Sequence, residues 1–330
     1  MTNGLHNTTR HVVPLDQPLR AQLVSFWSEV FDTPYGDFDA VLAGDECHAN
    51  KDIVYVTRLE NQIVSTCHLT VSRCDSRLGG LGEVGTHPQH RGRGFARQLC
   101  QQAAAEFDSL DGEALFLGTT NPMAARLYES LGWRYLPRTR VMLRTANRSA
   151  NNEKYLEQYF QGHSDHRLQI EPGGAQHRIL MIPLIVNSDN STVLDYNAQL
   201  LSVRTTEQQS CLRLYPRYQT VARHGQWFAA RREQGPMLGI ASVRLSDKGA
   251  AHVDAFVHLA SPTTLLVAMY RSALQWARGQ NILSVQTACA EADQTKRDAL
   301  IELNAEPSTQ YVHMDSSEHQ LDLMLFDLRT

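Results

Sequence analysis

The chain has 330 residues, of which 42% are hydrophobic and 20% charged, and its formal net charge is −4. This length favours two domains over one, and the hydrophobic content is sufficient for packed cores. The negative balance provides no basic field that would attract nucleic acid or anionic membranes, and no apolar run approaches the roughly 20 residues that cross a bilayer. We therefore expect neither a nucleic-acid partner nor a membrane partner.

The first half of the chain shows alternating strand and helix patterns. Residues 1–10 are polar without a secretory signal, which favours a cytoplasmic protein. Hydrophobic periodicity then predicts strands at 10–15, 53–59, 63–71, 81–86 and 114–117, and helices at 18–31 and about 95–107. A turn is expected at 78–80. A further helix has end signals on both sides, because Asn121 can cap it, Pro122 stands at its first position and Gly132 can follow its end in the left-handed conformation.

The second half repeats the order of these elements without repeating the residues. Residues 145 to about 175 are polar and rich in Gly, Asn and Gln, which predicts a linker with a short helix at 153–160. Beyond it we expect strands at 179–186, 227–231, 238–245, 252–259, 283–287, 310–314 and 321–328, and helices at 193–203, 263–277 and 295–303. The repeated order predicts a duplicated fold.

The six cysteines are scattered, without CxxC spacing or a ligand-like spacing to histidine. In a chain of this length the pattern indicates reduced thiols, not a disulfide framework or a zinc site. We therefore expect no metal, and no cysteine stands in a recognisable nucleophile context.

The most informative segment is a strand that runs into a loop rich in glycine and arginine, followed at once by a helix. The loop reads Arg91-Gly92-Arg93-Gly94-Phe95-Ala96. Backbone N–H groups at a helix start are unpaired, and glycines there allow an anion to approach them. The segment therefore predicts a pyrophosphate cradle, with a solvated basic turn as the alternative. It contains no GxxxxGK[ST] sequence, and Arg97 replaces the third small residue of a dinucleotide fingerprint.

This loop, with Pro88 before it, resembles the pyrophosphate signature of the GNAT superfamily of N-acetyltransferases. The second GNAT motif has its counterpart in Asn121 through Tyr128, followed by Leu131-Gly132-Trp133. The close match covers residues 81–133, and the compatible element order covers about 10–145. The resemblance implies that the chain binds acetyl-coenzyme A.

The resemblance also implies a role for each site residue. Arg91, Gly92, Arg93, Gly94, Phe95 and Ala96 would hold the pyrophosphate, and backbone N–H groups of Val84 and Thr86 would bind the acetyl carbonyl as an oxyanion hole. Asn121 would face the pantetheine arm, although its capping role alone could explain it. Tyr128 would act as the acid that protonates the leaving sulfur.

Glu83 is the candidate general base, because GNAT enzymes often carry an acidic residue on this strand. Three alternatives stay open at these positions. Glu83 could form a surface ion pair with an arginine, His87 could replace it as the base, and Tyr128 could be a packing residue only. In the second half, the segment Leu259–Thr264 has neither glycine nor arginine, and Leu300 stands where Tyr128 is expected.

We therefore predict an α/β (α+β) tandem of two acyl-coenzyme A N-acyltransferase folds, each a mixed, mostly antiparallel sheet flanked by helices. The active domain is expected at 1–145, a linker at 146–175 and a degenerate domain at 176–330. The predicted reaction is direct transfer of an acetyl group to the amine of a small molecule, by a monomer or a homodimer. An acyl-handling variant that acts on a carrier protein, and a non-catalytic acyl-coenzyme A-binding module, are the alternatives.

Overall fold

The computed structural model describes residues 7–146, 152–161, 167–189, 191–211, 213–233, 235–246, 249–282, 284–315 and 320–329. Most of the polar N-terminus, ten residues of the predicted linker and Leu283 lie outside these ranges. The chain forms two compact units, Met1–Tyr135 with Met142–Asn152 and Leu136–Val141 with Glu153–Thr330. The domain boundaries at 145 and 176 stay a prediction.

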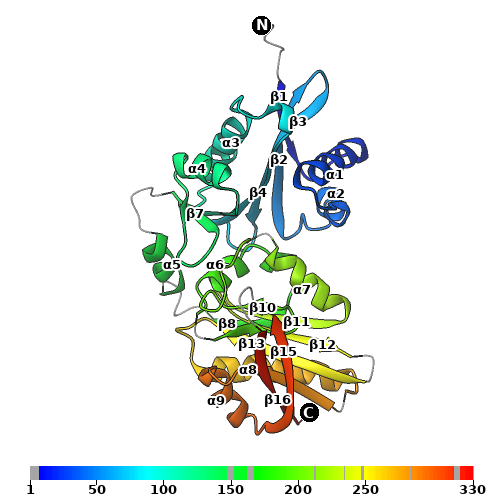
Figure 1. Ribbon diagram of the computed structural model, residues 1–330, viewed down its shortest axis with the longest axis vertical. Helices are drawn as coiled ribbons and strands as arrows, with labels where there is room; N and C mark the ends of the chain where they lie inside the picture. Colours follow the sequence, from blue (N-terminus) through cyan, green and yellow to red (C-terminus); the bar gives the residue numbers. More distant parts are fainter. Residues whose placement is uncertain are drawn as a thin grey trace. The chain divides into compact units, whose positions relative to one another are not determined.

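The first unit is built on a seven-stranded sheet with the order β1-β2-β3-β4-β5-β7-β6 (Figure 1). Its strands are β1 (Asn7–Val12), β2 (Asn50–Leu59), β3 (Gln62–Ser72), β4 (Leu78–Thr86), β5 (Ala114–Gly118), β6 (Arg134–Tyr135) and β7 (Val141–Thr145). Strands β1 to β4 pair antiparallel, whereas β4 and β5 pair parallel. The sheet is therefore mixed and mostly antiparallel.

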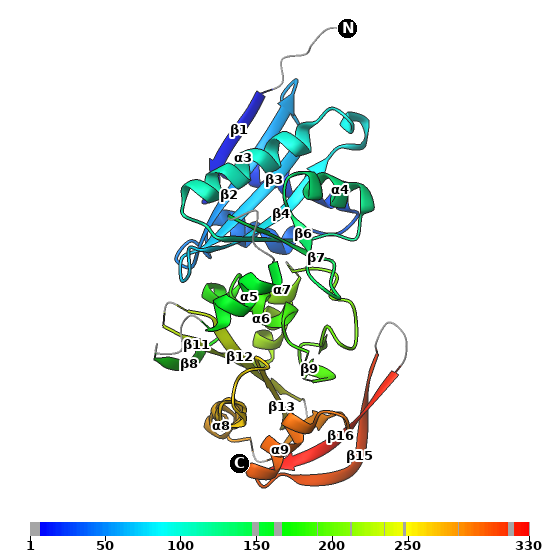
Figure 2. The same cartoon turned by 90° about the vertical axis from the view of Figure 1, so that its left-hand side faces the viewer.

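Helices cover both faces of this sheet. Helices α1 (Gln17–Phe31) and α2 (Asp39–Ala43), joined through η1 (Gly36–Phe38), lie on one face, and α3 (Phe95–Ser109) and α4 (Pro122–Ser130) lie on the other (Figures 1 and 2). Because side chains alternate along a strand, Val54 and Val56 of β2 pack with α1, whereas Ile53 and Tyr55 pack with α3.

Gly79 explains why α3 approaches the sheet closely. A Cβ atom at this position would lie 2.7 Å from Cε2 of Phe107, a distance at which a neighbouring atom must shift. The turn predicted at residues 78–80 is wrong, because these residues begin β4 and pair with both β3 and β5. Glycines in sequence indicate a turn, but here they make room for an aromatic ring.

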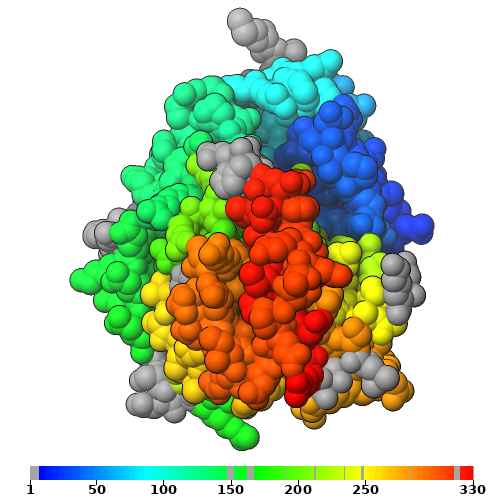
Figure 3. Space-filling view, turned by 60° about the horizontal axis from the view of Figure 1, so that its bottom comes forward, coloured from blue at the N-terminus to red at the C-terminus, as the bar shows by residue number. Residues whose placement is uncertain are grey.

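The second unit has the same topology. Its strands are β8 (Leu168–Pro172), β11 (Gly225–Arg232), β12 (Met237–Leu245), β13 (Ala250–Val257), β14 (Ser284–Cys289), β15 (Glu306–Asp315) and β16 (Gln320–Leu328). Their order, β8-β11-β12-β13-β14-β16-β15, repeats the first sheet strand for strand, including the parallel pair β13–β14. The predicted duplication of the fold is therefore confirmed. Figure 3 shows β15 and β16 at the surface of this unit.

The helices of the second unit are α5 (Asn152–Gln161), α6 (Met181–Val186), α7 (Leu214–Arg223), α8 (Thr263–Gly279) and α9 (Gln294–Glu302). Short elements complete it: η3 (Ala175–His177) and the two-stranded pair β9 (Val193–Asp195) and β10 (Leu200–Leu201). The helices predicted at 153–160, 263–277 and 295–303 are confirmed.

Two predictions for this unit are wrong. The strand predicted at 179–186 is the buried helix α6, since a short, wholly apolar run has no periodicity that separates the two states. The helix predicted at 193–203 is the pair β9–β10. Asp195 in this segment is fully buried, and its carboxylate accepts hydrogen bonds from Ser242 and the Ala198 N–H group. Strand β8 and helix α7 were not predicted.

Candidate active site

Strand β4 has an irregular pairing near its end, on the part of the strand that no longer pairs with β5. Its pairing with β3 shifts register between Thr66 and His68, and Glu83 lies opposite that shift with φ of 46°. A positive φ at a residue other than glycine costs about 1–3 kcal/mol and is concentrated at functional sites. Parallel pairing with β5 is recorded only as far as Gly80. Beyond it, the two strands diverge and leave one edge of β4 without its neighbour.

The N–H groups on that open edge follow from the strand geometry. The His87 N–H group donates to Val64 O on β3 at 2.9 Å. Because successive N–H groups in a strand point in opposite directions, those of Thr86 and Val84 point away from β3, toward the opening. These are the two residues predicted to provide an oxyanion hole, and both N–H groups lie on one strand edge.

The loop after β4 leaves the start of α3 open. Gly92 and Gly94 have φ values of 77° and 83°, which favour glycine, and a Cβ at either position would meet no atom within 4 Å. Gly94 is the N-cap of α3 and provides no side-chain cap. Phe95 is buried and anchors the helix, whereas the side chains of Arg91 and Arg93 are exposed. The open space at this helix start fits a pyrophosphate.

Helix α4 presents the second group of predicted residues. The Asn121 side chain caps this helix, because its Oδ1 accepts from the Met123 N–H group at 2.9 Å and from that of Ala124 at 3.4 Å. Gly132 follows the helix with φ of 103°, as predicted. The capping interpretation of Asn121 is confirmed, and its contact with a pantetheine arm stays a prediction.

Tyr128 on α4 is buried and packs edge to face with Trp133, with ring centroids 6.1 Å apart. Burial raises the pKa of Tyr128 well above its usual value, and Cys100, Cys67 and the charge of Glu83 raise it further. The structure thus brings Tyr128 and Glu83 into one electrostatic environment. The Tyr128 hydroxyl makes no hydrogen bond with any residue in the described ranges, so its O–H group is available to a ligand.

Glu83 is 8% exposed, so the alternative of a surface ion pair with an arginine is wrong. Its Oε2 atom lies 2.8 Å from Nδ1 of His68, and Nε2 of His68 lies 2.8 Å from Oδ1 of Asp52. The Thr70 hydroxyl donates to the same Asp52 oxygen at 2.7 Å. The other oxygen of Glu83, Oε1, has no hydrogen-bond partner among the described residues.

His87, the alternative base, lies apart from this hydrogen-bonded chain. Its Nε2 atom is 3.3 Å from Oε1 of Glu29, and its Nδ1 atom accepts from the Gln89 N–H group. Sequence reasoning missed His68 and Asp52. The available signal was an ionisable residue directly beside apolar residues in each strand, Asp52 before Ile53 in β2 and His68 before Leu69 in β3.

In the second unit the equivalent opening is occupied by the chain itself. Asp293 precedes α9 as Asn121 precedes α4, and its carboxylate accepts from the N–H groups of Thr192 and Val193. Asp254 stands three residues before the end of β13, as Glu83 does in β4, and accepts from the Tyr196 N–H group at 2.7 Å. The segment around β9 therefore bonds to both walls of the cleft.

A buried lysine completes this arrangement. Lys296 on α9 donates to Asp254 at 2.7 Å and to Leu194 O at 3.0 Å. Leu300, seven residues after Asp293, stands where Tyr128 stands relative to Asn121, and it has no proton to donate. The counterpart of the first unit's cleft is thus filled by backbone and closed by charged side chains.

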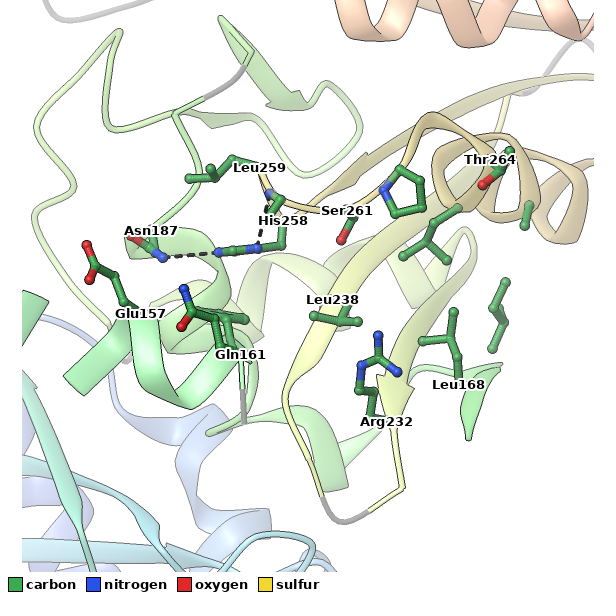
Figure 4. Close-up of a pocket in the computed structure, with 16 residues that line it drawn as sticks. Glu157, Gln161, Leu168, Asn187, Arg232, Leu238, His258, Leu259, Ser261 and Thr264 are labelled. Atoms are coloured by element: carbon green, nitrogen blue, oxygen red, sulfur yellow. Dashed lines mark hydrogen bonds between the residues drawn. The ribbon is translucent and has the colours of Figure 1, made fainter. Parts of the chain in front are cut away.

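A separate pocket of 610 Å³ lies within the second unit, beside the first turn of α8 (Figure 4). The His258 ring stacks on Phe160 with centroids 3.8 Å apart, and its Nε2 atom lies 3.1 Å from Nδ2 of Asn187. Burial lowers the pKa of His258 to about 4, so the imidazole is neutral at neutral pH. None of the catalytic or coenzyme-binding residues predicted from the sequence lines this pocket.

The described ranges contain no cluster of three or more His, Cys, Asp or Glu side chains that could hold a metal ion. They also contain no helix that is both long and apolar enough to cross a membrane.

A family model described as an acetyltransferase (GNAT) domain matches residues 50–135. No curated protein matches the chain. Similar solved structures include a putative acetyltransferase from Acinetobacter baylyi ADP1, with 14% identity and a TM-score of 0.40, covering 51% of this chain and 95% of that one. The putative acetyltransferase yncA from Salmonella typhimurium, solved with acetyl-coenzyme A, has 14% identity and a TM-score of 0.37, with 49% and 93% covered.

A ribosomal-protein-alanine N-acetyltransferase from Brucella melitensis has 13% identity and a TM-score of 0.38, with 49% of this chain and 99% of that chain covered. The first sheet opens between two parallel strands, beside a glycine–arginine loop at the start of a helix. Together with the family match, this arrangement defines the class: this protein is an acyltransferase. Its residues 50–135 form a GNAT acetyltransferase domain.

Proposed function

We propose that the first unit binds acetyl-coenzyme A and transfers its acetyl group directly to the amine of a small molecule. The observation that carries this proposal is the juxtaposition on β4 and α3 of an open glycine loop, a free strand edge and a buried carboxylate. Each part meets one requirement of the chemistry: binding of an anion, stabilisation of an oxyanion and removal of a proton.

In the proposed reaction, the pyrophosphate lies at the start of α3, between Arg91 and Ala96. The acetyl carbonyl accepts hydrogen bonds from the Val84 and Thr86 N–H groups, which stabilise the negative charge that develops on its oxygen. Glu83 removes a proton from the acceptor ammonium through its unpaired Oε1 atom. The amine nitrogen then bonds to the carbonyl carbon, the carbon–sulfur bond breaks, and the nitrogen loses its second proton to solvent to give the amide.

Tyr128 acts on the departing sulfur. Full proton transfer from a phenol to a thiolate is uphill, because a phenol titrates near 10 and a thiol near 8.5. Burial raises the pKa of Tyr128 further, so the transfer is more unfavourable in this site than in water. We therefore assign Tyr128 a hydrogen bond that stabilises the developing thiolate. The proton that converts the thiolate to the thiol comes from solvent, either directly or through the Tyr128 hydroxyl.

The second unit would not bind the coenzyme. The segment Thr192–Tyr196 occupies the polar groups of its cleft, and the loop before α8 contains neither glycine nor arginine. One coenzyme per chain is therefore expected.

The experiment is an amine-library screen with acetyl-coenzyme A, in which release of free thiol is measured and the acetylated product is identified by mass spectrometry. Thiol release that depends on a particular amine, and that is lost in Glu83→Gln, supports the proposal. Reaction with malonyl-coenzyme A and a carrier protein instead would transfer the assignment to an acyl-handling enzyme. Coenzyme binding with no acceptor-dependent turnover would indicate a binding module.

A further inference from the structure

Three side chains from three neighbouring strands form one buried hydrogen-bonded chain in the first unit. Glu83 of β4, His68 of β3 and Asp52 of β2 are joined by two contacts of 2.8 Å through the two nitrogens of the imidazole ring. His68 and Asp52 are each 1% exposed. A charged cluster this deeply buried is costly unless its members compensate one another.

The hydrogen-bond pattern determines the protonation state of this chain. Each nitrogen of His68 faces a carboxylate oxygen, and a carboxylate can only accept. A neutral imidazole would place one unprotonated nitrogen against a carboxylate oxygen, and the two could not form a hydrogen bond. Both ring nitrogens donate to the facing carboxylates only when both carry protons. Burial by itself lowers the pKa of His68, but hydrogen bonds to Asp52 and Glu83 and their charges outweigh it and raise the pKa to about 9.

We infer that His68 and Asp52 are positioning residues that act through Glu83, holding its Oε2 atom while leaving Oε1 to take the substrate proton. This inference rests on the proposed role of Glu83 as the base. The imidazolium donates a hydrogen bond to the buried Glu83 carboxylate, and Asp52 offsets the positive charge that the ring brings to the site. The three groups together carry one negative charge.

Titratable groups on neighbouring elements face this chain. Among the described residues they include the thiols of Cys67 on β3 and Cys47 before β2, and the phenol of Tyr128 on α4. Thiols and phenols are uncharged in the acid range. From η1, the Phe38 ring meets the imidazole edge to face at 5.5 Å. The fall in rate on the acid side of the pH–rate profile, its acid limb, should therefore report on Glu83, His68 and Asp52.

The test compares pH–rate profiles of three variants with the wild type. Asp52→Asn removes a negative charge and should move the midpoint of the acid limb to lower pH by about one unit. His68→Asn keeps an N–H donor near Glu83 but removes the positive charge, and should move the midpoint to higher pH by a similar amount. The double variant should restore it to near the wild-type position. Thr70→Val, which removes a neutral donor to Asp52, is the matched control and should leave the midpoint in place.

The outcomes separate this inference from the proposed function. If Glu83→Gln keeps the wild-type limb, Glu83 is not the base. If Glu83→Gln abolishes the limb but Asp52→Asn and His68→Asn leave the midpoint unmoved, the base role stands and the positioning inference is wrong. Side-chain nitrogen NMR of the wild-type protein does not depend on the folding of variants. It should show a histidine that stays doubly protonated to about pH 8, and the absence of such a signal would overturn the inference.

Discussion

Gly94→Glu tests the loop at the start of α3 with a magnitude that follows from the structure. Gly94 has φ of 83°, and a Cβ there would meet no atom within 4 Å, so the substitution causes backbone strain of about 1–2 kcal/mol without a clash. A carboxylate about 4 Å from a pyrophosphate oxygen is repelled by about 4 kcal/mol at an effective dielectric constant of about 20. That energy corresponds to a roughly thousandfold loss of affinity for acetyl-coenzyme A.

The assay is a thermal shift at a coenzyme concentration of about 100 times the wild-type Kd. Mass action then stabilises the wild type by about 2.7 kcal/mol, which raises Tm by roughly 5–10 °C for a domain of this size. In Gly94→Glu the same concentration is about one tenth of the variant's Kd, so the shift should fall to nearly zero. Gly249→Glu is the matched control, because Gly249 has φ of 72° and open space, but lies in the second unit. It should have similar strain and keep the full shift.

An undiminished shift in Gly94→Glu would remove this loop from the coenzyme site. Loss of the shift in both variants would mean that strain or added charge, and not the position of the carboxylate, is responsible.

The remaining predictions concern the chemistry and the two buried clusters. Tyr128→Phe should lower kcat by roughly 10²–10⁴ with the Kd for acetyl-coenzyme A nearly unchanged; wild-type kcat would reduce Tyr128 to a packing residue. Calorimetric titration should give one acetyl-coenzyme A per chain, and two sites would contradict the filled cleft of the second unit. Lys296→Met leaves Asp254 buried without its cation and should cost about 3–5 kcal/mol of unfolding free energy in a urea titration. The pKa of His68 is raised from 6.5 to about 9, so its contribution of about 3 kcal/mol is present below pH 6.5 and lost as pH rises to 9. Stability that does not fall over this range, or falls equally in His68→Asn, would contradict the protonated state.

Local patterns in the sequence predicted most of the first unit. The alternation in β2 and β3 and the capping signals of Asn121 and Gly132 are short-range features, and the residues that form them lie within a few positions of one another. The anion cradle was predictable for the same reason, because Arg91 to Ala96 form a continuous strand–loop–helix transition. In the second unit, the patterns of α8 and α9 were equally clear.

Only the tertiary structure decided the partners of Glu83. His68 and Asp52 are 15 and 31 positions away in the sequence, and their contact depends on the register of β2, β3 and β4. No local pattern records that register, since the irregularity that turns Glu83 toward His68 arises from pairing between strands. The apolar run of α6 was ambiguous between strand and helix for a related reason: burial on all sides removes the periodicity that separates them. The sequence by itself determined which segments are regular and where an anion can bind, because these depend on neighbours along the chain. The folded structure decided which charges are buried together, and that depends on neighbours in space.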